Sequence, residues 1–258
     1  MATNTVATLA NSPEERLKIE VAACTRLLNM EGILGYSGHV SVRLPDRKSL
    51  LIQSFDASRT DLGPEELFTV DLDGKVIDGP AEGRPVNEVE IHSEIMRARD
   101  DVNAVLHYHP EIATLFTVVE GIDLIPIKNH AMRWASGIPV HSETWHIDTQ
   151  ELGRELAETL GPHHAALLRA HGAVIASESI PALMIDTVHF EENAKAMYDA
   201  AQLGKINPMS KAEMDRFHSL FDRDKHVVKL WRYYLSRGLE SGTLPVEWAN
   251  FLFPSERV

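Results

Sequence analysis

Two histidines stand two residues apart in the stretch "VLHYHP", residues 105–110. Successive side chains of a β-strand point to opposite faces, so His107 and His109 would share one face of a strand. An apolar run precedes them and a proline follows, which predicts the end of a buried strand. Two imidazoles placed in this way suit a metal ion or proton transfer, and they also suit simple packing. The motif alone leaves these three interpretations open.

A third histidine favours the metal interpretation. His171 lies in "ALLRAHGAVIA" between two short apolar segments, and Gly172 beside it lets another stretch of backbone approach closely. Together with His107 and His109, it would complete a face of three imidazoles. Such a face leaves one coordination position open for substrate or water, which is typical of catalytic rather than structural zinc sites.

The sequence around these histidines predicts a sheet with helices on both faces. Ser12, Pro13 and Glu15 have the pattern of a capped helix start, and Gly32 suits the position after its end. Segments joined by tight turns, such as Asp73-Gly74, predict an α/β protein with a mostly antiparallel sheet. The other expected elements are strands at 35–44, 50–53 and 103–109, a hairpin at 67–78 and two short strand segments within 165–176. Helices are expected at 87–101, 110–119, 148–161, 179–203 and 210–237, the last two stopped by Gly204 and Gly238.

Composition narrows the class of protein. The formal net charge is −13 and no basic run occurs, which argues against a nucleic-acid groove or an anionic membrane surface as partner. A single cysteine, Cys24, excludes an internal disulfide and a cysteine-based zinc cluster. No signal peptide and no apolar stretch of membrane-spanning length is evident, so we expect a cytoplasmic protein. We expect a disordered N-terminus over residues 1–12, one catalytic domain over 13–205, and a helical extension over 206–258 that packs on the same domain or on a neighbouring subunit.

A set of segments in a fixed order resembles the class II aldolase/adducin family over roughly residues 14–203. The resemblance implies a three-layer α/β/α sandwich around a mostly antiparallel sheet, assembled as a homotetramer with active sites at subunit borders. It implies one divalent metal ion per subunit (zinc, manganese, cobalt or iron) held by His107, His109 and His171. It also implies that Glu88, which by itself reads as a helix-capping carboxylate, is a ligand or an acid/base. The segments are "GYSGHVSVR", "VDLDGKVIDG", "PVNEVEIHSEIMRARDDVNAVLHYHP", "ALLRAHGAV" and "FEENAKAMYDA".

The chain departs from the family at three phosphate-binding loops of the sugar-phosphate aldolases. The G-N-x-S turn reads "GHVS", so His39 replaces asparagine, and the T-P-S-G-like loop reads "QSFDASR". The P-S-S-E loop reads "PVNE", in which Val86 and Asn87 replace both serines. Small hydroxyl and glycine positions donate hydrogen bonds to phosphate oxygens. A sugar-phosphate substrate is therefore not expected, and the G-H turn resembles that of the family's decarboxylase branch.

Four further side chains are candidates for contact with the substrate. His39 is a candidate proton donor or hydrogen-bonding residue near the metal. Arg59, near the altered second loop, is a candidate bidentate partner for a carboxylate. His130 and Arg133 lie in an irregular segment that could line a pocket. Each also has a plain structural explanation, such as a solvated arginine, and His92 is expected to be a packing or supporting residue.

These observations lead to the hypothesis of a metal-dependent lyase acting on a small, non-phosphorylated carboxylate. The favoured reaction is decarboxylation of a hydroxylated aromatic acid in the breakdown of aromatic compounds. The alternatives are a metal-dependent aldolase of a pyruvate-type hydroxy-keto acid, an iron(II) enzyme that activates oxygen, and an adducin-like scaffold without catalysis. Retention of the three histidines and Glu88 argues against the scaffold.

Overall fold

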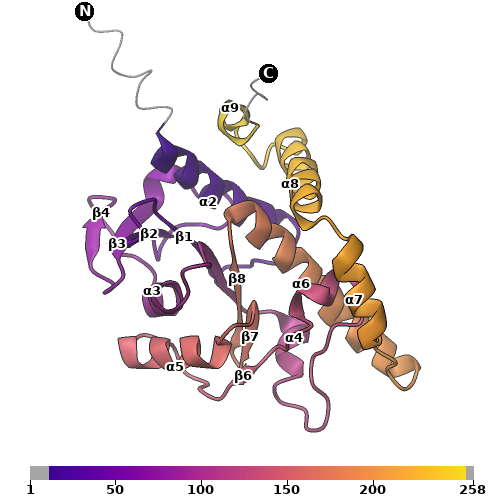
Figure 1. The fold of residues 1–258 in the computed structure, drawn as a ribbon. Coiled ribbons are helices and arrows are strands. Elements are labelled where there is room, and N and C mark those ends of the chain that lie inside the picture. The colour runs from indigo at the N-terminus through magenta and orange to yellow at the C-terminus, as the bar shows by residue number, and fades with distance from the viewer. Residues whose placement is uncertain (1–11, 254–258) are drawn as a thin grey trace, which may run out of the picture.

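The computed structural model describes residues 12–253 (Figure 1), so the expected disordered segment, apart from Ser12, lies outside the described residues. One eight-stranded sheet runs through the molecule in the order β4-β3-β2-β1-β5-β8-β7-β6. Every neighbouring pair is antiparallel except β6 and β7. The strands are β1 (His39–Arg43), β2 (Ser49–Gln53), β3 (Leu67–Asp71), β4 (Val76–Asp78), β5 (Ala104–Tyr108), β6 (Val140–His141), β7 (Ala165–Leu168) and β8 (Gly172–Ser177).

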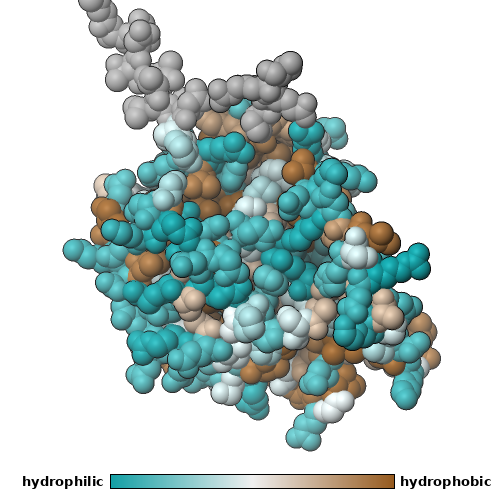
Figure 2. Space-filling view, viewed as in Figure 1, coloured by the Kyte–Doolittle hydropathy of each residue, from teal (hydrophilic) through white to brown (hydrophobic). Residues whose placement is uncertain are grey.

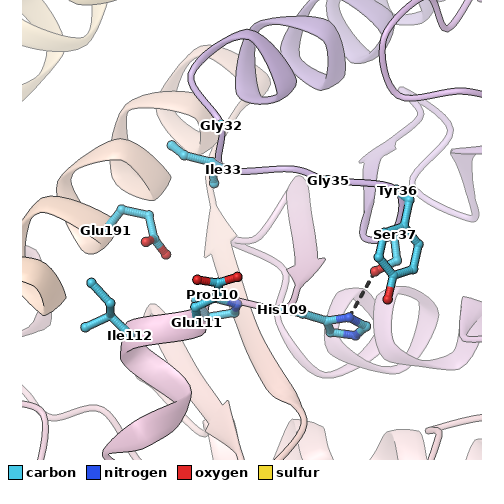
Figure 3. Close-up of a pocket in the computed structure, with 10 residues that line it drawn as sticks. All are labelled: Gly32, Ile33, Gly35, Tyr36, Ser37, His109, Pro110, Glu111, Ile112 and Glu191. Carbon is cyan, nitrogen blue, oxygen red and sulfur yellow. Dashed lines mark hydrogen bonds between the residues drawn. The ribbon is translucent and has the colours of Figure 1, made fainter.

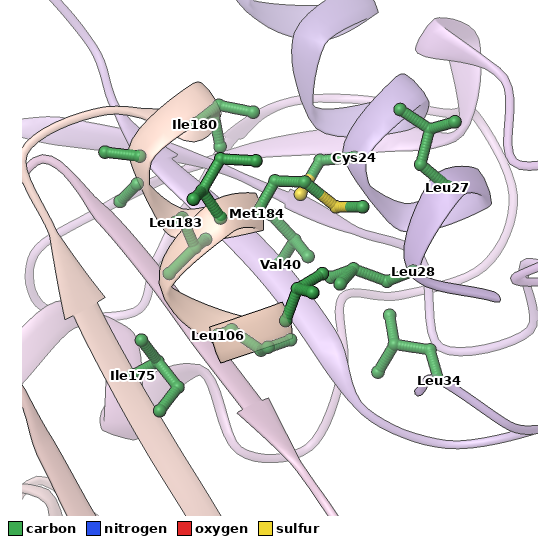
Figure 4. Packing of buried hydrophobic residues seen from close by; sticks show 14 of the residues in the cluster. Cys24, Leu27, Leu28, Leu34, Val40, Leu106, Ile175, Ile180, Leu183 and Met184 are labelled. Atoms are coloured by element: carbon green, nitrogen blue, oxygen red, sulfur yellow. The ribbon is translucent and has the colours of Figure 1, made fainter. Parts of the chain in front are cut away.

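Helices cover both faces of this sheet (Figure 1). On one face lie α2 (Pro13–Met30), α4 (Glu111–Leu115) and α6 (Ile180–Leu203), and on the other lie α3 (Val89–Ala98) and α5 (Gln150–Leu160). Because strand side chains alternate, the sheet contributes to two separate apolar clusters. Figure 4 shows the larger cluster, in which Leu106 of β5 packs with residues of α2 and α6. The result is the predicted three-layer α/β/α sandwich.

The register of the central strands brings distant histidines to one end of the sheet. His39 of β1 lies directly opposite His107 of β5, and β8, which begins just after His171, pairs Ala173 with Tyr108. A Cβ atom on Gly172 would lie 2.4 Å from the carbonyl oxygen of Tyr108, so only glycine permits this approach. The sequence-based expectation for that glycine is thereby confirmed.

The C-terminal part differs from its prediction in the number of its helices and in the role of Gly238. The expected single helix over 210–237 is wrong, because the chain forms α7 (Lys211–Leu220) and α8 (Arg223–Glu240). Asp222 starts the second helix by accepting a hydrogen bond from the backbone N–H of Lys225, which competes with continuing the first one. The short helices η3 (Val246–Trp248) and α9 (Ala249–Leu252) complete the described chain.

Gly238 also has a different role from the predicted one. It lies inside α8 and does not end it, and a Cβ atom there would lie 2.7 Å from Leu27 of α2. The small residue therefore allows α8 to pack closely on α2. The expected helix over 110–119 is likewise shorter, since α4 ends at Leu115 and tighter turns follow.

The surface in Figure 2 is largely hydrophilic, with hydrophobic side chains in separate patches. Among the exposed large hydrophobic residues are four that belong to α4 and the segment after it: Leu115, Val118, Val119 and Ile122. Within residues 12–253, the structure has no helix with the length and apolar character that crossing a membrane requires.

Candidate metal and active site

The three histidines predicted as ligands converge in space. One ring nitrogen from each of His107, His109 and His171 lies within 4.8 Å of the corresponding atoms of the other two. The ring centroids form a nearly equilateral triangle, with separations of 5.1, 5.0 and 5.0 Å. His107 lies in strand β5, His109 follows directly after the end of that strand, and the β7–β8 turn supplies His171. The geometry therefore brings together residues more than sixty positions apart in the sequence.

Glu88 lies beside two of these three histidines. Its Oε2 atom is 3.6 Å from His107 Nε2, and its Oε1 atom is 3.9 Å from His171 Nε2. Although Glu88 occupies the N-cap position of α3, its side chain makes no capping hydrogen bond. Oε1 instead accepts a hydrogen bond of 3.0 Å from the backbone N–H of Ile147. The simple capping explanation for this carboxylate is therefore excluded.

The electrostatics of the site match its geometry. Burial alone would raise the pKa of Glu88, but the neighbouring His39 and His107 rings and the Ile147 N–H hold that pKa well below its usual range. Burial lowers the pKa of His109 to about 4, and it also lowers the pKa of His107 and His171. At neutral pH the site consequently presents an anionic carboxylate among neutral imidazoles, which is the protonation state that metal ligation requires.

Hydrogen-bond partners orient the rings of two of these histidines through the second ring nitrogen. His107 Nδ1 lies 3.1 Å from the carbonyl oxygen of Ala173 and so carries the proton, which leaves Nε2 bare. That Nε2 atom is buried without a hydrogen-bond partner. His109 Nδ1 lies 2.9 Å from Ser37 Oγ (Figure 3). A carbonyl partner fixes the tautomer of a histidine in this way, whereas a hydroxyl can donate or accept and only orients the ring. These residues therefore fit a divalent cation.

His39 also belongs to the site. Its Nε2 atom is 3.7 Å from Glu88 Oε2, and its ring centroid is 5.2 Å from that of His107. Its Nδ1 atom is 2.6 Å from Nε2 of His92, which is fully buried on α3. His92 therefore contacts the Nδ1 side of the His39 ring, and the Nε2 side of that ring faces the Glu88 carboxylate.

Arg59 lies close to the turn before His39, but its guanidinium already donates hydrogen bonds to backbone carbonyl oxygens. The side chain is buried, its Nε donates to the carbonyl oxygen of Gly38 at 3.0 Å, and Nη1 donates to that of Ala57 at 2.5 Å. These bonds hold the turn before β1. A substrate carboxylate would have to use the remaining N–H groups of the guanidinium.

His130 and Arg133 lie elsewhere, in the short helix η2 (Asn129–Trp134). His130 Nε2 is 2.9 Å from a Glu192 carboxylate oxygen, and Arg133 donates to Glu178 at 2.8 Å. Within the described chain, neither has a hydrogen bond, ion pair or ring contact with Glu88 or with the histidines around it. The structure thus does not bring these two predicted residues to the histidine cluster.

The structure adds His146, which sequence reasoning missed. Its Nδ1 atom lies 3.7 Å from Glu88 Oε1, and its half-exposed side chain is open to a substrate. The neighbouring Ile147 N–H is the donor to Glu88, so the loop between β6 and α5 is docked onto the site. No spacing motif marks His146, because only the tertiary fold brings this loop beside α3.

A cavity of about 470 Å³ adjoins His109 (Figure 3). Pockets for small organic ligands usually have this order of volume, roughly 300–1,000 Å³. Tyr36 and Ser37 lie at one end of the cavity, and the carboxylates of Glu111 and Glu191 lie toward the other (Figure 3). The complete lining is Gly32, Ile33, Gly35, Tyr36, Ser37, His109, Pro110, Glu111, Ile112 and Glu191.

Comparison with known proteins defines the class of protein. Residues 19–198 match the family model described as the Class II Aldolase and Adducin N-terminal domain, and the chain belongs to this family. It is 26% identical over 230 residues to a 3,4-dihydroxyphthalate decarboxylase of Arthrobacter keyseri, covering 84% of this chain and 92% of the relative. It is 30% identical over 195 residues to a protein of the same name from Rhodococcus jostii, covering 70% and 79%.

The fold comparison agrees. An aldolase II superfamily protein from Pseudomonas syringae matches with a TM-score of 0.80 at 22% identity, covering 92% of this chain and 98% of that one. The predicted family and fold class are confirmed. Since the relatives are decarboxylases and aldolases, this chain is an enzyme of the lyase class, and the scaffold alternative is set aside. The family depends on a divalent metal ion, for which the histidine and glutamate cluster is the candidate site.

Proposed function

We propose that this chain is a divalent-metal-dependent decarboxylase of a non-phosphorylated hydroxyaromatic acid, with dihydroxyphthalate-type acids as the first substrates to test. The observation that carries the proposal is the convergence of three neutral imidazoles and one anionic carboxylate beside a ligand-sized cavity. The choice of decarboxylation is supported by His39 at the family's asparagine position and by the two relatives named 3,4-dihydroxyphthalate decarboxylase.

The altered phosphate loops support a substrate without phosphate. Val86, at a family serine position, is buried in the apolar cluster beneath the sheet. Asn87, at the other serine position, hydrogen-bonds the side chain of Arg84. In the second loop, the Ser58 and Thr60 hydroxyls bond each other at 2.7 Å. These groups are engaged in local contacts, so they do not form a cradle of donors for phosphate oxygens.

Decarboxylation breaks the bond between a ring carbon and the carboxyl carbon. The electron pair stays on the ring, a proton takes the place of CO₂ on that carbon, and the net reaction consumes one proton from solvent. A divalent ion held by His107, His109 and His171 would act as a Lewis acid toward the negative charge that develops on the substrate's hydroxyl oxygen. The side chains of the chain itself must then bind the acid and move the proton.

Glu88 is placed to move that proton. It is ionised at neutral pH, so it can accept the proton of the substrate hydroxyl and deliver it to the ring carbon after CO₂ has left. His39 faces the same carboxylate and is the second group near the reacting atoms. Arg59 remains our candidate for the substrate carboxylate. His130 and Arg133 are less favoured for that role, because Glu192 and Glu178 already pair with them.

The proposal also covers the oligomeric state of the protein and its location in the cell. We infer a homotetramer, for which the exposed apolar residues of α4 and the following segment, including Leu115 and Val118, are candidate subunit contacts. Figure 2 shows that hydrophobic side chains gather in patches on an otherwise hydrophilic face. Light scattering after size-exclusion chromatography would measure the assembly directly. The cytoplasmic location stays a prediction.

The test of the proposed reaction is a reconstitution assay. Protein stripped with a chelator would be reloaded separately with zinc, manganese, cobalt or iron(II) and supplied with 3,4-dihydroxyphthalate. We expect CO₂ release that depends on the added ion and disappears again on chelation. Aldehyde release from hydroxy-keto acids, with no CO₂ from any dihydroxybenzoate or phthalate, would establish the aldolase alternative in its place. Oxygen uptake by the iron(II) form alone would establish the oxygen-activating one.

A further inference from the structure

Behind His39, two buried side chains continue a line of hydrogen bonds away from the site. His92 Nε2 lies 2.6 Å from His39 Nδ1, and His92 Nδ1 lies 2.6 Å from Ser41 Oγ. His92 and Ser41 are both fully buried. His39 and Ser41 stand two apart on strand β1 and so share a face, and α3 inserts His92 between them. This line ends in the site, where His39 Nε2 is 3.7 Å from Glu88 Oε2.

Each hydrogen bond between Ser41, His92 and His39 contains one proton. If both rings are neutral, the three residues can therefore donate either toward His39 or toward Ser41. In the first, the Ser41 hydroxyl donates to His92 Nδ1, His92 Nε2–H donates to His39 Nδ1, and His39 carries its proton on Nε2. In the second, every donor and acceptor is exchanged, and His39 Nε2 is bare. A doubly protonated ring at His92 or at His39 also leaves a proton on His39 Nε2. Only one arrangement therefore exposes a bare nitrogen to Glu88.

One contact disfavours that arrangement. It would leave the hydroxyl proton of Ser41 without an acceptor, since His92 is the one hydrogen-bond partner of that side chain within residues 12–253. A buried donor without a partner is costly. In the first arrangement every donor faces an acceptor, from Ser41 through to Glu88.

We propose that Ser41 and His92 are positioning residues that hold His39 as the tautomer protonated on Nε2. His39 then donates a hydrogen bond into the site and cannot ligate a metal ion. This removes one of three overlapping sets of possible ligands, the set of His39, Glu88 and His107, whose ligand atoms also lie within 4.8 Å of one another. The role of His39 toward the substrate rests on the proposed function, whereas its tautomer is a property of the protein alone.

Nitrogen NMR tests the tautomer without any substrate. Protein labelled with ¹⁵N in its histidines would be compared before and after loading with zinc, and the His39 signals would be assigned from the spectrum of His39→Asn. We expect two-bond nitrogen–proton correlations that show a protonated Nε2 and a bare Nδ1 in both states. A His39 ring protonated on Nδ1, or an Nε2 signal that zinc shifts as a ligand, would overturn the proposal.

Substitution of Ser41 tests whether the line sets that tautomer. Ser41→Ala removes the donor that fixes His92, so the Nδ1-protonated form of His39 should become clearly populated. Ser41→Thr returns the hydroxyl and should return the original signature. Ser49→Ala is the matched control, since Ser49 is a buried serine of the neighbouring strand that bonds Asp46 and lies outside the site. An unchanged His39 signature in folded Ser41→Ala would refute the positioning role.

Kinetics adds a second readout if 3,4-dihydroxyphthalate is turned over. Loss of a donor aimed at developing charge costs about 100-fold or more in kcat, so a partial loss in Ser41→Ala should lower kcat by about fivefold with little change in KM. His92→Phe should approach the full loss, and its metal content should stay unchanged. If no CO₂ is released by any form while the NMR signature holds, the proposed reaction fails and the tautomer assignment stands.

Discussion

The molecule contains two groups of histidines in ring contact, and they differ in what the rings face. In the site, ring nitrogens of four histidines lie between 3.6 and 3.9 Å from Glu88, and these are His39, His107, His146 and His171. In the second group, the rings follow one another in a row and are tilted by 33° at each contact. The centroids of His130 and His189 are 4.3 Å apart, and those of His189 and His226 are 5.3 Å apart.

The second group has no common focus. His130 lies next to Glu192, and the Nε2 atom of His226 is buried without a partner. Within residues 12–253, each set of side chains with metal-ligand spacing includes Glu88 or His107, and none includes the second group. The comparison teaches that clustering of histidines is a weak sign of chemistry. Convergence of their nitrogens on one point beside a cavity is the stronger sign.

The largest difference between the two groups should appear when one histidine of each is removed. His109→Ala should abolish metal binding and lower turnover by about 1,000-fold or more, because a metal ligand is lost. His109 is exposed, so the fold should remain. The matched control is His130→Ala in the second group, which should keep both metal and turnover. Metal content by mass spectrometry, kcat and the circular dichroism spectrum would be measured, and loss of metal in His130→Ala would break the distinction.

Glu88→Gln should distinguish the role of the Glu88 carboxylate from that of the histidines around it. The amide keeps the shape and can still accept from the N–H of Ile147, but it cannot move a proton. We expect retained metal and a loss of about 10²–10⁴ in kcat, the usual contribution of a general acid or base. Glu90→Gln, at a neighbouring glutamate outside the cluster, is the control. Full activity in Glu88→Gln would show that this carboxylate does not transfer the proton.

Arg59, near the site, and Arg133, near the second group, can be compared in the same way, with a smaller expected effect. Arg59→Lys keeps the charge but loses the planar fork, so KM for a carboxylate substrate should rise about tenfold if Arg59 binds it. If Arg59 acts only by holding the turn at Gly38, kcat should fall instead, because His39 would be displaced. Arg133→Lys, in the pairing with Glu178, should change neither constant by more than about twofold.

The parts of the site that the sequence predicted are marked by a local pattern of residues or by motifs that follow one another in a fixed order. His107 and His109 follow the two-residue period of a strand, and His171 is marked by the glycine that the close approach to Tyr108 requires. Glu88 came from the family resemblance, since its local pattern indicated only a helix cap. These residues could be identified because the chain encodes them within short segments of a fixed order.

The parts that sequence did not predict depend on tertiary packing. His146 reaches Glu88 because an irregular loop docks through the N–H of Ile147. The mostly antiparallel sheet with helices on both faces followed from the pattern of strands and helices, but the break at Asp222 depends on one side chain capping a new helix. Gly238 reads as a stop signal, and only its contact with Leu27 reveals a packing role.

The second histidine group should affect stability in acid and leave catalysis unaffected. Burial, aided by the charges of His130, His226 and Arg223, lowers the pKa of His189 from 6.5 to about 3. Between these two values the unfolded state binds a proton that the folded state does not. The free energy of unfolding must therefore fall as the pH falls from 6.5 toward 3, and it is fully restored above 6.5.

His189→Phe removes this titration while keeping an aromatic ring in the stack. Urea unfolding at pH 7 and pH 5 would measure the difference in unfolding free energy between the two conditions, which should shrink by about 1–2 kcal/mol relative to the parent. The same replacement at the exposed His218 is the control and should leave that difference as it is. Metal content and turnover of His189→Phe should stay within about twofold, as expected for a cluster that only packs. Within the described residues, the two groups share no ring contact or ion pair. A loss of bound metal in His189→Phe would therefore contradict the view that the second group has no effect on the site.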